Sequence, residues 1–335
     1  MASTLATALL PIVLTLLLGF FAGWHHDFSA DQAPILNRMV MLYALPLSLF
    51  AGMVTVSRSS LVSDLPMAGM VAGTMVVAFV VVVVVTRVVL HRDLGEAALW
   101  GLAIGGPAVP FVGTPVLGTL LGSAQATVPI AVASLTMNLV QVPAALVMLS
   151  VAHSASTRAR ASAPASASPA PAAARGTAGA PKPAAGAGGH VLAALREPVV
   201  WAPLAALVLV LAGWSLPHAV TSSLALLGQA TGGVALFASG LVLYAQRVSL
   251  TAPVGWAVAC RNLVIPALVL GLTALLGFSH ENREASVLAM AIPTASICVI
   301  LAVQYHRAER QMASVLFIST VASVATMAGF IALTR

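Results

Sequence analysis

Charged residues are scarce in this chain. Only 7% of its 335 residues are Asp, Glu, Lys or Arg, whereas 60% are hydrophobic. Because a soluble domain carries about 25% charged residues, this composition excludes a soluble globular protein. The lipid bilayer is therefore the expected surroundings of the chain.

Cysteine is almost absent as well, and so are the common motifs of enzymes. The two cysteines, Cys260 and Cys298, fall inside apolar runs without a neighbouring histidine. This excludes a secreted disulfide framework and gives no zinc-site pattern. No phosphate-binding loop, dinucleotide fingerprint or nucleophile motif occurs. We therefore do not expect an enzyme, or ATP-driven transport by this chain alone.

What the chain has in abundance is long apolar runs. Most of them reach the roughly 20 residues that an α-helix needs to cross about 30 Å of hydrocarbon. The ten runs fall at residues 5–24, 34–56, 66–90, 97–121, 127–152, 198–216, 222–245, 252–278, 285–305 and 312–334. We therefore predict an all-α membrane protein with ten transmembrane helices.

The distribution of Lys and Arg predicts which side of the membrane each end faces. No basic residue precedes the first run, so we interpret it as a retained helix with its N-terminus outside. Arg58, Arg283 and Arg335 then fall outside. The cytoplasmic set has eleven members: Arg38, Arg87, Arg92, Arg158, Arg160, Arg175, Lys182, Arg196, Arg247, Arg307 and Arg310. This distribution agrees with the positive-inside rule, so both termini are expected outside. The net charge of +6 is thereby explained by topology, and no nucleic-acid partner is expected.

Residues 153–196 divide the chain into two halves. From His153 to Arg196 the sequence consists mainly of Ala, Pro, Ser and Gly without hydrophobic periodicity. Such a segment buries too little apolar surface to offset the entropy of ordering it. We predict a disordered cytoplasmic linker between two five-helix halves, residues 1–152 and 197–335, and a regulatory role for this linker stays open.

Short sequences of the first half recur in the second. AGW at 22–24 returns at 212–214, LFA at 49–51 returns at 236–238, and EAALWGLAI from Glu96 returns as EASVLAMAI from Glu284. The offsets are 190, 187 and 188 residues, and the copies are five apolar runs apart. Because five is odd, the second copy enters the membrane from the opposite face, which is the inverted-repeat pattern of secondary transporters.

The fourth and ninth runs carry residues that interrupt a helix. Run four holds Gly105, Gly106, Pro107, Pro110, Gly113 and Pro115, and run nine holds Pro293 within AIPTAS. Each proline removes an amide donor and crowds the carbonyl four residues earlier. Both repeats break after the same point, at Ile104 and Ile292. We expect two discontinuous helices that cross near the midplane and build a binding site; ordinary proline kinks are the alternative.

The free ends of these broken helices form the candidate anion site. A helix N-terminus presents unpaired amides and about half a positive charge. The predicted substrate-binding residues of the two breaks are Gly105, Gly106, Pro107, Pro110, Gly113, Thr114, Pro115, Pro293, Thr294, Ala295 and Ser296. Their backbone and hydroxyls would hold a carboxylate, although each hydroxyl has the alternative of bonding its own helix.

Arg261 is the single charged residue placed deep within a run, about nine residues into run eight. A buried Arg costs about 2.5 to 3.5 kcal/mol on insertion scales and normally has a partner. A substrate carboxylate fits its planar fork. The alternatives are that it snorkels toward the cytoplasm or caps the carbonyls of a broken helix. Nearby Asn262, and Asn138 with Gln141 on one helix face, either line the site or bond across helices.

Acidic residues are missing from the depth of every run, so the usual carboxylate relay for a coupled cation is missing too. No cofactor is expected. Uptake of an anion against an inside-negative potential would need a coupling ion, either a proton that rides on the substrate or a cation such as sodium at unwound carbonyls. The sequence leaves open whether the protein forms a homodimer.

Several stretches of the chain match a known group of transporters. They are ILNRMVMLYALPLSLFAGM in run two, FVGTPVLGTLLG in run four, MNLVQVP in run five, PVVWAP in run six and AIPTAS in run nine. These stretches resemble the auxin efflux carrier family, in particular its bacterial members labelled malonate transporters. Many relatives carry an asparagine near each crossing proline, where this chain has Ala108 and Ser296 or Ile297, so contacts of those asparagines do not carry over.

The resemblance implies ten helices in two inverted repeats, a scaffold part and a transport part, and helices that cross in runs four and nine. It also implies the bacterial inner membrane as location and small organic anions as substrates. The expected function is therefore alternating-access transport of a carboxylate such as malonate. An anion channel, and a membrane sensor or assembly subunit that transports nothing, are the alternatives.

Overall fold

The structure is a computed structural model that describes residues 2–29, 32–54, 65–109, 113–161, 198–214, 216–246 and 248–334. Every named element in these ranges is a helix, and the single β-bridge joins Pro107 and Thr294. The all-α class predicted from the sequence is confirmed.

The elements of the first half run from α1 to α9, with η marking a π-helical turn. They are α1 (Ala2–Trp24), α2 (Ala33–Met39), η2 (Val40–Ala44), α3 (Leu45–Val54), α5 (Leu65–Val84), η3 (Val85–Val89), α6 (Leu94–Gly105), α7 (Thr114–Leu121), α8 (Ser123–Thr136), η5 (Met137–Gln141) and α9 (Val142–Ala161). The second half has α11 (Pro198–Leu211), α12 (His218–Gln246), α13 (Ala252–Ala259), η6 (Cys260–Val264), α14 (Ile265–Leu275), α15 (His280–Ala291), α16 (Ile297–Gln304) and α17 (Glu309–Thr334).

Several of these helices suit a bilayer. Among the described residues, five helices are long and apolar enough to cross a membrane: Leu65–Val89, Val128–Ser156, Ala219–Ala245, Ala252–Leu275 and Glu309–Thr334. Shorter apolar helices occupy Val13–Trp24 and Leu94–Gly105.

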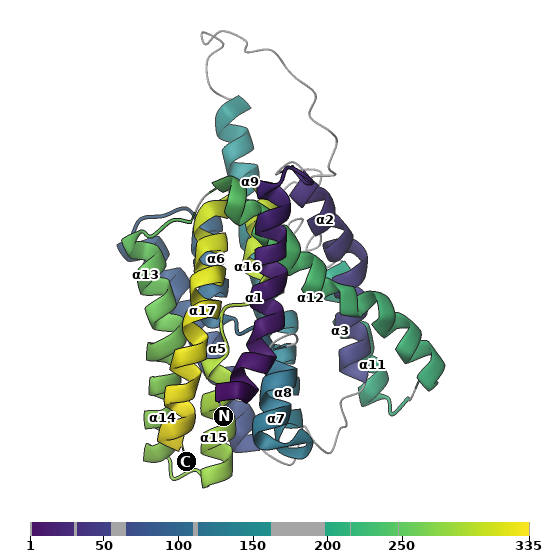
Figure 1. The fold of residues 1–335 in the computed structure, drawn as a ribbon, viewed down its shortest axis with the longest axis vertical. Helices are drawn as coiled ribbons and strands as arrows, with labels where there is room; N and C mark the ends of the chain where they lie inside the picture. Colours follow the sequence, from purple (N-terminus) through teal and green to yellow (C-terminus); the bar gives the residue numbers. More distant parts are fainter. Residues whose placement is uncertain are drawn as a thin grey trace.

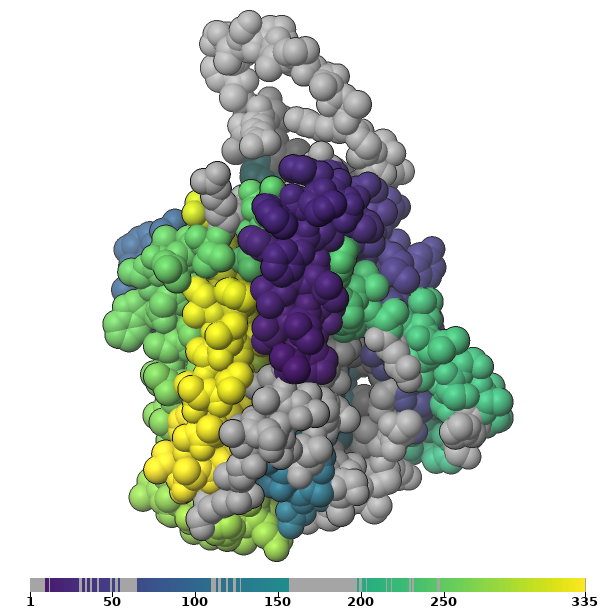
Figure 2. Space-filling view, viewed as in Figure 1, coloured from purple at the N-terminus to yellow at the C-terminus, as the bar shows by residue number. Residues whose placement is uncertain are grey.

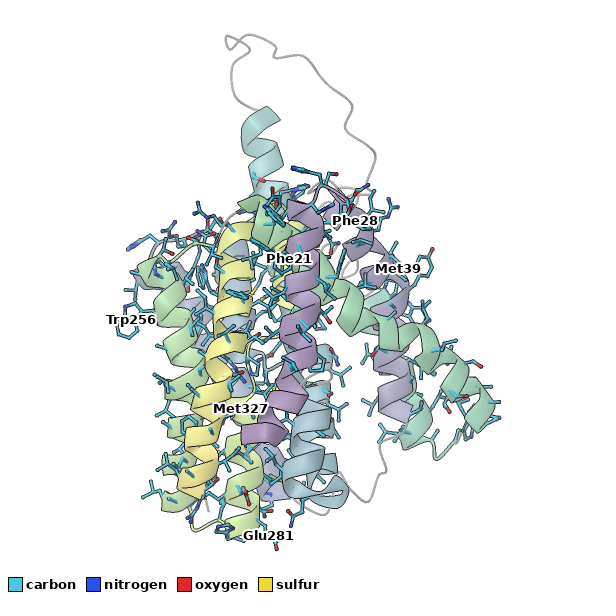
Figure 3. The ribbon with its side chains drawn as sticks, in the orientation of Figure 1. Phe21, Phe28, Met39, Trp256, Glu281 and Met327 are labelled. Carbon is cyan, nitrogen blue, oxygen red and sulfur yellow. The ribbon has the colours of Figure 1, made fainter. Side chains whose placement is uncertain are left out.

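The outer surface is apolar as well. On α5 and η3, Val77, Val81 and Val88 are 61%, 52% and 63% exposed. Trp256 projects outward from α13 (Figure 3) and is 69% exposed. Large exposed apolar patches of this kind mark surfaces that contact protein or lipid rather than water. Together with the long apolar helices, this surface indicates a multi-pass membrane protein.

The helices form two groups (Figure 1). In the first, α1 packs along α12, while α11 and α12 both pack on α3. In the second, α5 packs on α6, α6 packs on α9, and α15 packs on α14 and α17. The groups meet where α1 lies beside α17 (Figure 2), where α16 contacts α2, and where η5 contacts α11. The interrupted helices therefore belong to the second group, next to its boundary with the first.

Two glycines allow the close approach of α1 and α12 in the first group. A Cβ atom on Gly19 would lie 2.0 Å from the carbonyl oxygen of Phe237, and one on Gly240 would lie 2.1 Å from that of Leu16. Both neighbours are backbone atoms, so a side chain at either position forces the two helices apart.

Gly240→Ala is therefore expected to lower the melting temperature of the purified protein in detergent, since overpacking costs about 1 to 3 kcal/mol. Gly271→Ala is the matched control, because a Cβ there meets no atom within 4 Å. The comparison uses the temperature at which each variant leaves the monodisperse peak in size-exclusion chromatography. Equal temperatures for the two variants would contradict the close-packing argument.

Both chain ends lie at one end of the molecule, and α9 leaves at the other (Figure 1). The helix α9 continues to Ala161, so residues 153–161 of the predicted linker are helical. The residues that follow His153, SASTRARA, contain neither Gly nor Pro, so nothing in them stops a helix that is already nucleated. The rest of the predicted linker, up to Arg196, lies outside the described residues.

Prolines explain three of the four π-helical turns named above, all within the described residues. Pro46, Pro143 and Pro266 each follow by two residues the end of η2, η5 and η6. Because proline lacks an amide hydrogen and crowds the carbonyl four residues earlier, the helix widens at that carbonyl. The four polar residues predicted for the site outside the breaks, Asn138, Gln141, Arg261 and Asn262, all lie in η5 or η6.

The two interruptions lie within one residue of the predicted places. The helix α6 ends at Gly105 and α15 at Ala291, and each has 12 residues. Their continuations α7 and α16 have 8 residues each. The residue after each first segment is extended, with φ −105° and ψ 104° at Gly106 and φ −62° and ψ 138° at Ile292. These are breaks in the backbone rather than proline kinks.

Candidate functional site

The two broken helices are joined through their extended backbone. The amide of Ala108 donates to the carbonyl of Pro293 at 2.9 Å, and the amide of Ala295 donates to that of Gly106 at 3.1 Å. These bonds form a short antiparallel bridge between Pro107 and Thr294. Non-helical backbone at membrane depth needs such partners, because lipid supplies none. The predicted crossing of the two interrupted segments is thus present in the structure.

Arg261 links the C-terminal ends of α6 and α15. Its side chain is fully buried. Nη1 donates to the carbonyl of Ile104 at 3.1 Å, Nη2 to those of Met290 and Ile292 at 3.1 and 2.7 Å, and Nε to that of Ile292 at 3.0 Å. The last carbonyls of a helix have no partner within the helix and carry about half a negative charge. Of the alternatives left open by the sequence, this geometry favours capping of the broken helices.

Protein donors satisfy the end of α6. Leu102 O accepts from the amide of Gly106, Ala103 O from the Thr294 hydroxyl at 2.8 Å, and Ile104 O from Arg261. Gly105 O accepts from Gln141 Nε2 at 3.1 Å. Each of the last four carbonyls of α6 therefore has a partner, and a bound cation is not needed to satisfy them.

A second set of bonds fixes the break that follows α15. The amide of Thr294 donates to the Ser319 hydroxyl at 3.2 Å, and that hydroxyl donates to Asn262 Oδ1 at 2.7 Å. Asn262 Nδ2 returns a bond to the carbonyl of Ser319 at 2.8 Å. Asn262 thus positions α17 against the break. Of the two roles that the sequence allowed for Asn262, this one is a hydrogen bond across helices. Ser319 was not predicted, because its sequence context resembles that of Ser323, which bonds its own helix.

Gln141 points one free acceptor at the break in α6. Its Nε2 donates to the carbonyls of Met75 and Gly105 at 2.8 and 3.1 Å, which fixes the orientation of the amide. Its Oε1 is buried and has no hydrogen-bond partner among the described residues. A Cβ atom on Gly106 would lie 3.4 Å from this oxygen. A buried acceptor without a partner costs about 1 to 3 kcal/mol, so a donor in a bound molecule would be favourable here.

Asn138, on the same π-helical turn, is 7% exposed and forms no side-chain hydrogen bond within the described residues. Asn138 and Gln141 together offer amide donors and one amide acceptor beside the break. The η5 turn that carries them contacts α11 of the other helix group.

The helices α7 and α16 continue after the two breaks, and their N-terminal ends lie at the crossing. Gly113, the residue before α7, lies against the opposite break, because a Cβ atom there would be 2.8 Å from Ile292 Cδ1. Neither Gly113 nor Ser296 caps its helix through a side-chain hydrogen bond. Each helix end carries about half a charge. The positive charge of Arg261 therefore offsets the negative C-terminal ends of α6 and α15. The positive N-terminal ends of α7 and α16 remain, and they leave a net positive charge at the crossing.

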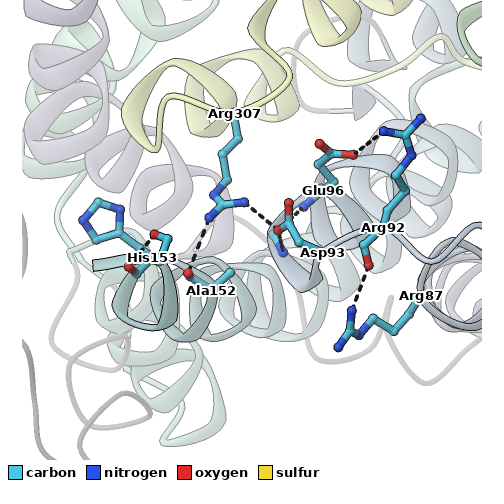
Figure 4. A network of polar contacts seen from close by, with 9 residues as sticks. Arg87, Arg92, Asp93, Glu96, Ala152, His153 and Arg307 are labelled. Carbon is cyan, nitrogen blue, oxygen red and sulfur yellow. Dashed lines mark hydrogen bonds and ion pairs between the residues drawn. The ribbon is translucent and has the colours of Figure 1, made fainter. Parts of the chain in front are cut away.

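A polar network ties the same helices together at the end where α9 leaves (Figure 4). Asp93 caps α6 by accepting from the amides of Gly95 and Glu96 at 2.7 and 3.2 Å. Arg307, just beyond α16, pairs with Asp93 at 2.6 Å and donates to the carbonyl of Ala152 on α9 at 3.4 Å. The start of α6 and the end of α16 are thus held together by this ion pair, in addition to the backbone bridge at the breaks.

The structure brings most of the predicted site residues together at the crossing: Gly105, Gly106, Pro107, Gly113, Asn138, Gln141, Arg261, Asn262, Pro293, Thr294, Ala295 and Ser296. Pro110 lies outside the described residues, and so do the side chains of Thr114 and Pro115. The Thr294 hydroxyl bonds Ala103 O, so it is a structural link between the two breaks.

Comparison with known proteins agrees with this architecture. A family model described as "Membrane transport protein" matches residues 4–331. The uncharacterized transporter YfdV of Escherichia coli K12 is 28% identical over 326 residues, which cover 95% of this chain and 94% of that protein. Proteins of the same name from Escherichia coli O157:H7 and Shigella flexneri match equally well. The chain, whose two broken helices are joined at their breaks, therefore belongs to the auxin efflux carrier family of membrane transport proteins.

Proposed function

We propose that this protein is a secondary active transporter of small organic anions, carboxylates such as malonate, that works by alternating access. The observation that carries the proposal is the crossing itself. It joins two helix N-termini that have no side-chain cap with a buried arginine that offsets the opposite helix ends. The resulting positive potential, in a region without described acidic side chains, favours a carboxylate.

The same proposal includes ten transmembrane segments in two inverted repeats, in the inner membrane with both termini outside. Matching lengths of the broken helices support it, with 12 and 8 residues in each half. Figure 1 supports it too, because both chain ends lie at one end of the molecule and α9 leaves at the other, so that each half crosses the membrane an odd number of times. The two helix groups would shift relative to one another to expose the crossing alternately to either side.

Gln141 suggests which form of the acid is carried. A carboxylate offers only acceptors, whereas Oε1 of Gln141 needs a donor. A dicarboxylic acid with one protonated carboxyl supplies both groups: its hydroxyl donates to Gln141 Oε1, and its carboxylate accepts from Asn138 and the helix N-termini. The proton would then cross on the substrate, and sodium is not required because protein donors already satisfy the α6 carbonyls.

Counterflow in liposomes tests the proposal. Purified protein is reconstituted and preloaded with unlabelled malonate, succinate or another small carboxylate, and uptake of the labelled acid is followed. We expect saturable exchange that is independent of sodium and rises as the pH falls, because acid increases the share of the monoprotonated species. Non-saturable flux would indicate a channel, and the absence of flux for every carboxylate would refute the proposal.

A further inference from the structure

Ser286 differs from most of the other buried hydroxyls on these helices. Buried Ser and Thr in membrane helices usually donate to a carbonyl three or four residues earlier. Thr136, Ser239, Thr273, Thr320 and Ser323 do so here at 2.7 to 2.8 Å. Ser286 is completely buried in α15, yet its Oγ has no hydrogen-bond partner among the described residues. Its hydroxyl is therefore available to a molecule that enters the protein.

Arg283 lies one turn before Ser286 on the same helix. Its Nε atom is buried and also has no hydrogen-bond partner, and Arg283 forms no ion pair within the described residues. Residues three apart lie on one face of a helix, with Cβ atoms about 5 to 6 Å apart. Glu281 and Glu284 are on the same helix, but neither pairs with Arg283. A cationic donor and a hydroxyl donor, both unsatisfied, thus occupy neighbouring positions.

The surroundings restrict what can bind there. Residues 285–292 are all buried, at no more than 2% exposure, and α15 packs against α5, α8, α14 and α17. Such an enclosed position excludes a lipid chain, so the ligand of these two donors has to be small. An unpaired guanidinium and a hydroxyl both donate, so the matching ligand is an oxyanion with two acceptor oxygens.

We propose that Arg283 and Ser286 form a second carboxylate site, through which the transported anion passes before it reaches the crossing. One carboxylate oxygen accepts from Arg283 Nε and the other from the Ser286 hydroxyl. The site lies at the end of the molecule that carries both chain ends, where Figure 3 labels Glu281. Ser286 is six residues from Ile292, or about 9 Å along the helix. This inference rests on the proposed transport of a carboxylate and adds a binding step on one side only.

The first test measures transport from each side separately. Arg283→Gln and Ser286→Ala are reconstituted in zwitterionic phosphatidylcholine vesicles of known orientation. The assay uses the labelled carboxylate that the wild-type protein exchanges fastest. We expect the KM measured from the Arg283 side to rise roughly fivefold or more, with the maximal rate and the KM from the opposite side unchanged. Arg38→Gln and Ser323→Ala are matched controls, because Arg38 is exposed elsewhere and Ser323 bonds its own helix.

Three results would overturn the second site: an unchanged KM on both sides, an equal loss of rate from both sides, or a KM change that occurs only when anionic lipid is present. Absence of exchange by the wild-type protein would instead refute the proposed function. The two failures are therefore distinct.

A second measurement does not depend on the substrate. Ser286→Cys is made in a Cys260→Ser, Cys298→Ala background, and its reaction with a sulfonate-bearing methanethiosulfonate is compared with that of a trimethylammonium analogue. We expect the anionic reagent to react at least fivefold faster, and Arg283→Gln to abolish the preference. Equal rates for the two reagents, or no reaction with either, would exclude a route for anions past Ser286.

Discussion

Arg261→Met is expected to abolish transport and to destabilise the protein. The substitution keeps an apolar chain of similar reach, but it leaves the carbonyls of Ile104, Met290 and Ile292 without their four bonds. A hydrogen bond to a charged group contributes about 1.5 to 3 kcal/mol, so loss of several such bonds should reduce exchange at least about a hundredfold, which corresponds to roughly 2.7 kcal/mol. The measurements are initial counterflow rate and melting temperature in detergent.

Two variants separate this role from direct substrate binding. Arg261→Lys keeps the charge but not the planar fork that reaches both helix ends, so we expect it to recover stability only in part. Arg38→Met removes an exposed arginine from α2 and should leave both measurements unchanged. If Arg261→Met had normal stability and a raised KM alone, Arg261 would be a substrate ligand rather than a cap for the broken helices.

Gln141→Leu is the second substitution with a large expected effect. It removes the donor shared by Met75 O and Gly105 O and also the free acceptor beside Gly106. Gly105 O then lacks a partner, at a cost of about 1 to 3 kcal/mol, whereas Met75 O keeps its bond within α5, and the proposed partner of the protonated carboxyl disappears. We expect the initial exchange rate to fall at least about tenfold, which corresponds to roughly 1.4 kcal/mol.

The pH dependence of the remaining activity identifies the role of the acceptor. With Gln141 present, exchange should increase in acid. With Gln141→Leu, the increase should be lost even where some exchange remains. Gln304→Leu serves as control, because Gln304 is exposed at the end of α16. An unaltered pH profile in Gln141→Leu would show that this amide does not recognise a protonated substrate.

The sequence predicted the breaks well because proline and glycine act locally. Pro107 and Pro293 remove amide donors regardless of what surrounds them, so the ends of α6 and α15 could be placed within one residue. The repeated EAALWGLAI and EASVLAMAI segments indicated that the two breaks correspond. Three of the π-helical turns follow a similar local signal, since Pro46, Pro143 and Pro266 lie just beyond η2, η5 and η6.

The partners within the site could not be predicted, because they depend on distant parts of the chain. Arg261 and Ile104 are 157 positions apart, and Thr294 and Ala103 are 191 apart. Composition alone cannot distinguish an arginine that binds carbonyl groups from one that binds a carboxylate. Ser319 and Ser286 illustrate the same limit: each is an ordinary serine in an apolar run, and only its neighbours show that one supports a break and the other lacks a partner.

The bridge between Pro107 and Thr294 has a consequence for how such a protein can change its specificity. The joint is made by main-chain atoms of Gly106, Ala108, Pro293 and Ala295, and amide and carbonyl groups are the same whatever side chain is attached. In the proposed mechanism, mutations that exchange the polar groups beside the joint therefore alter which anion is carried while the main-chain joint keeps its shape. Selectivity and the connection between the two broken helices can thus evolve separately.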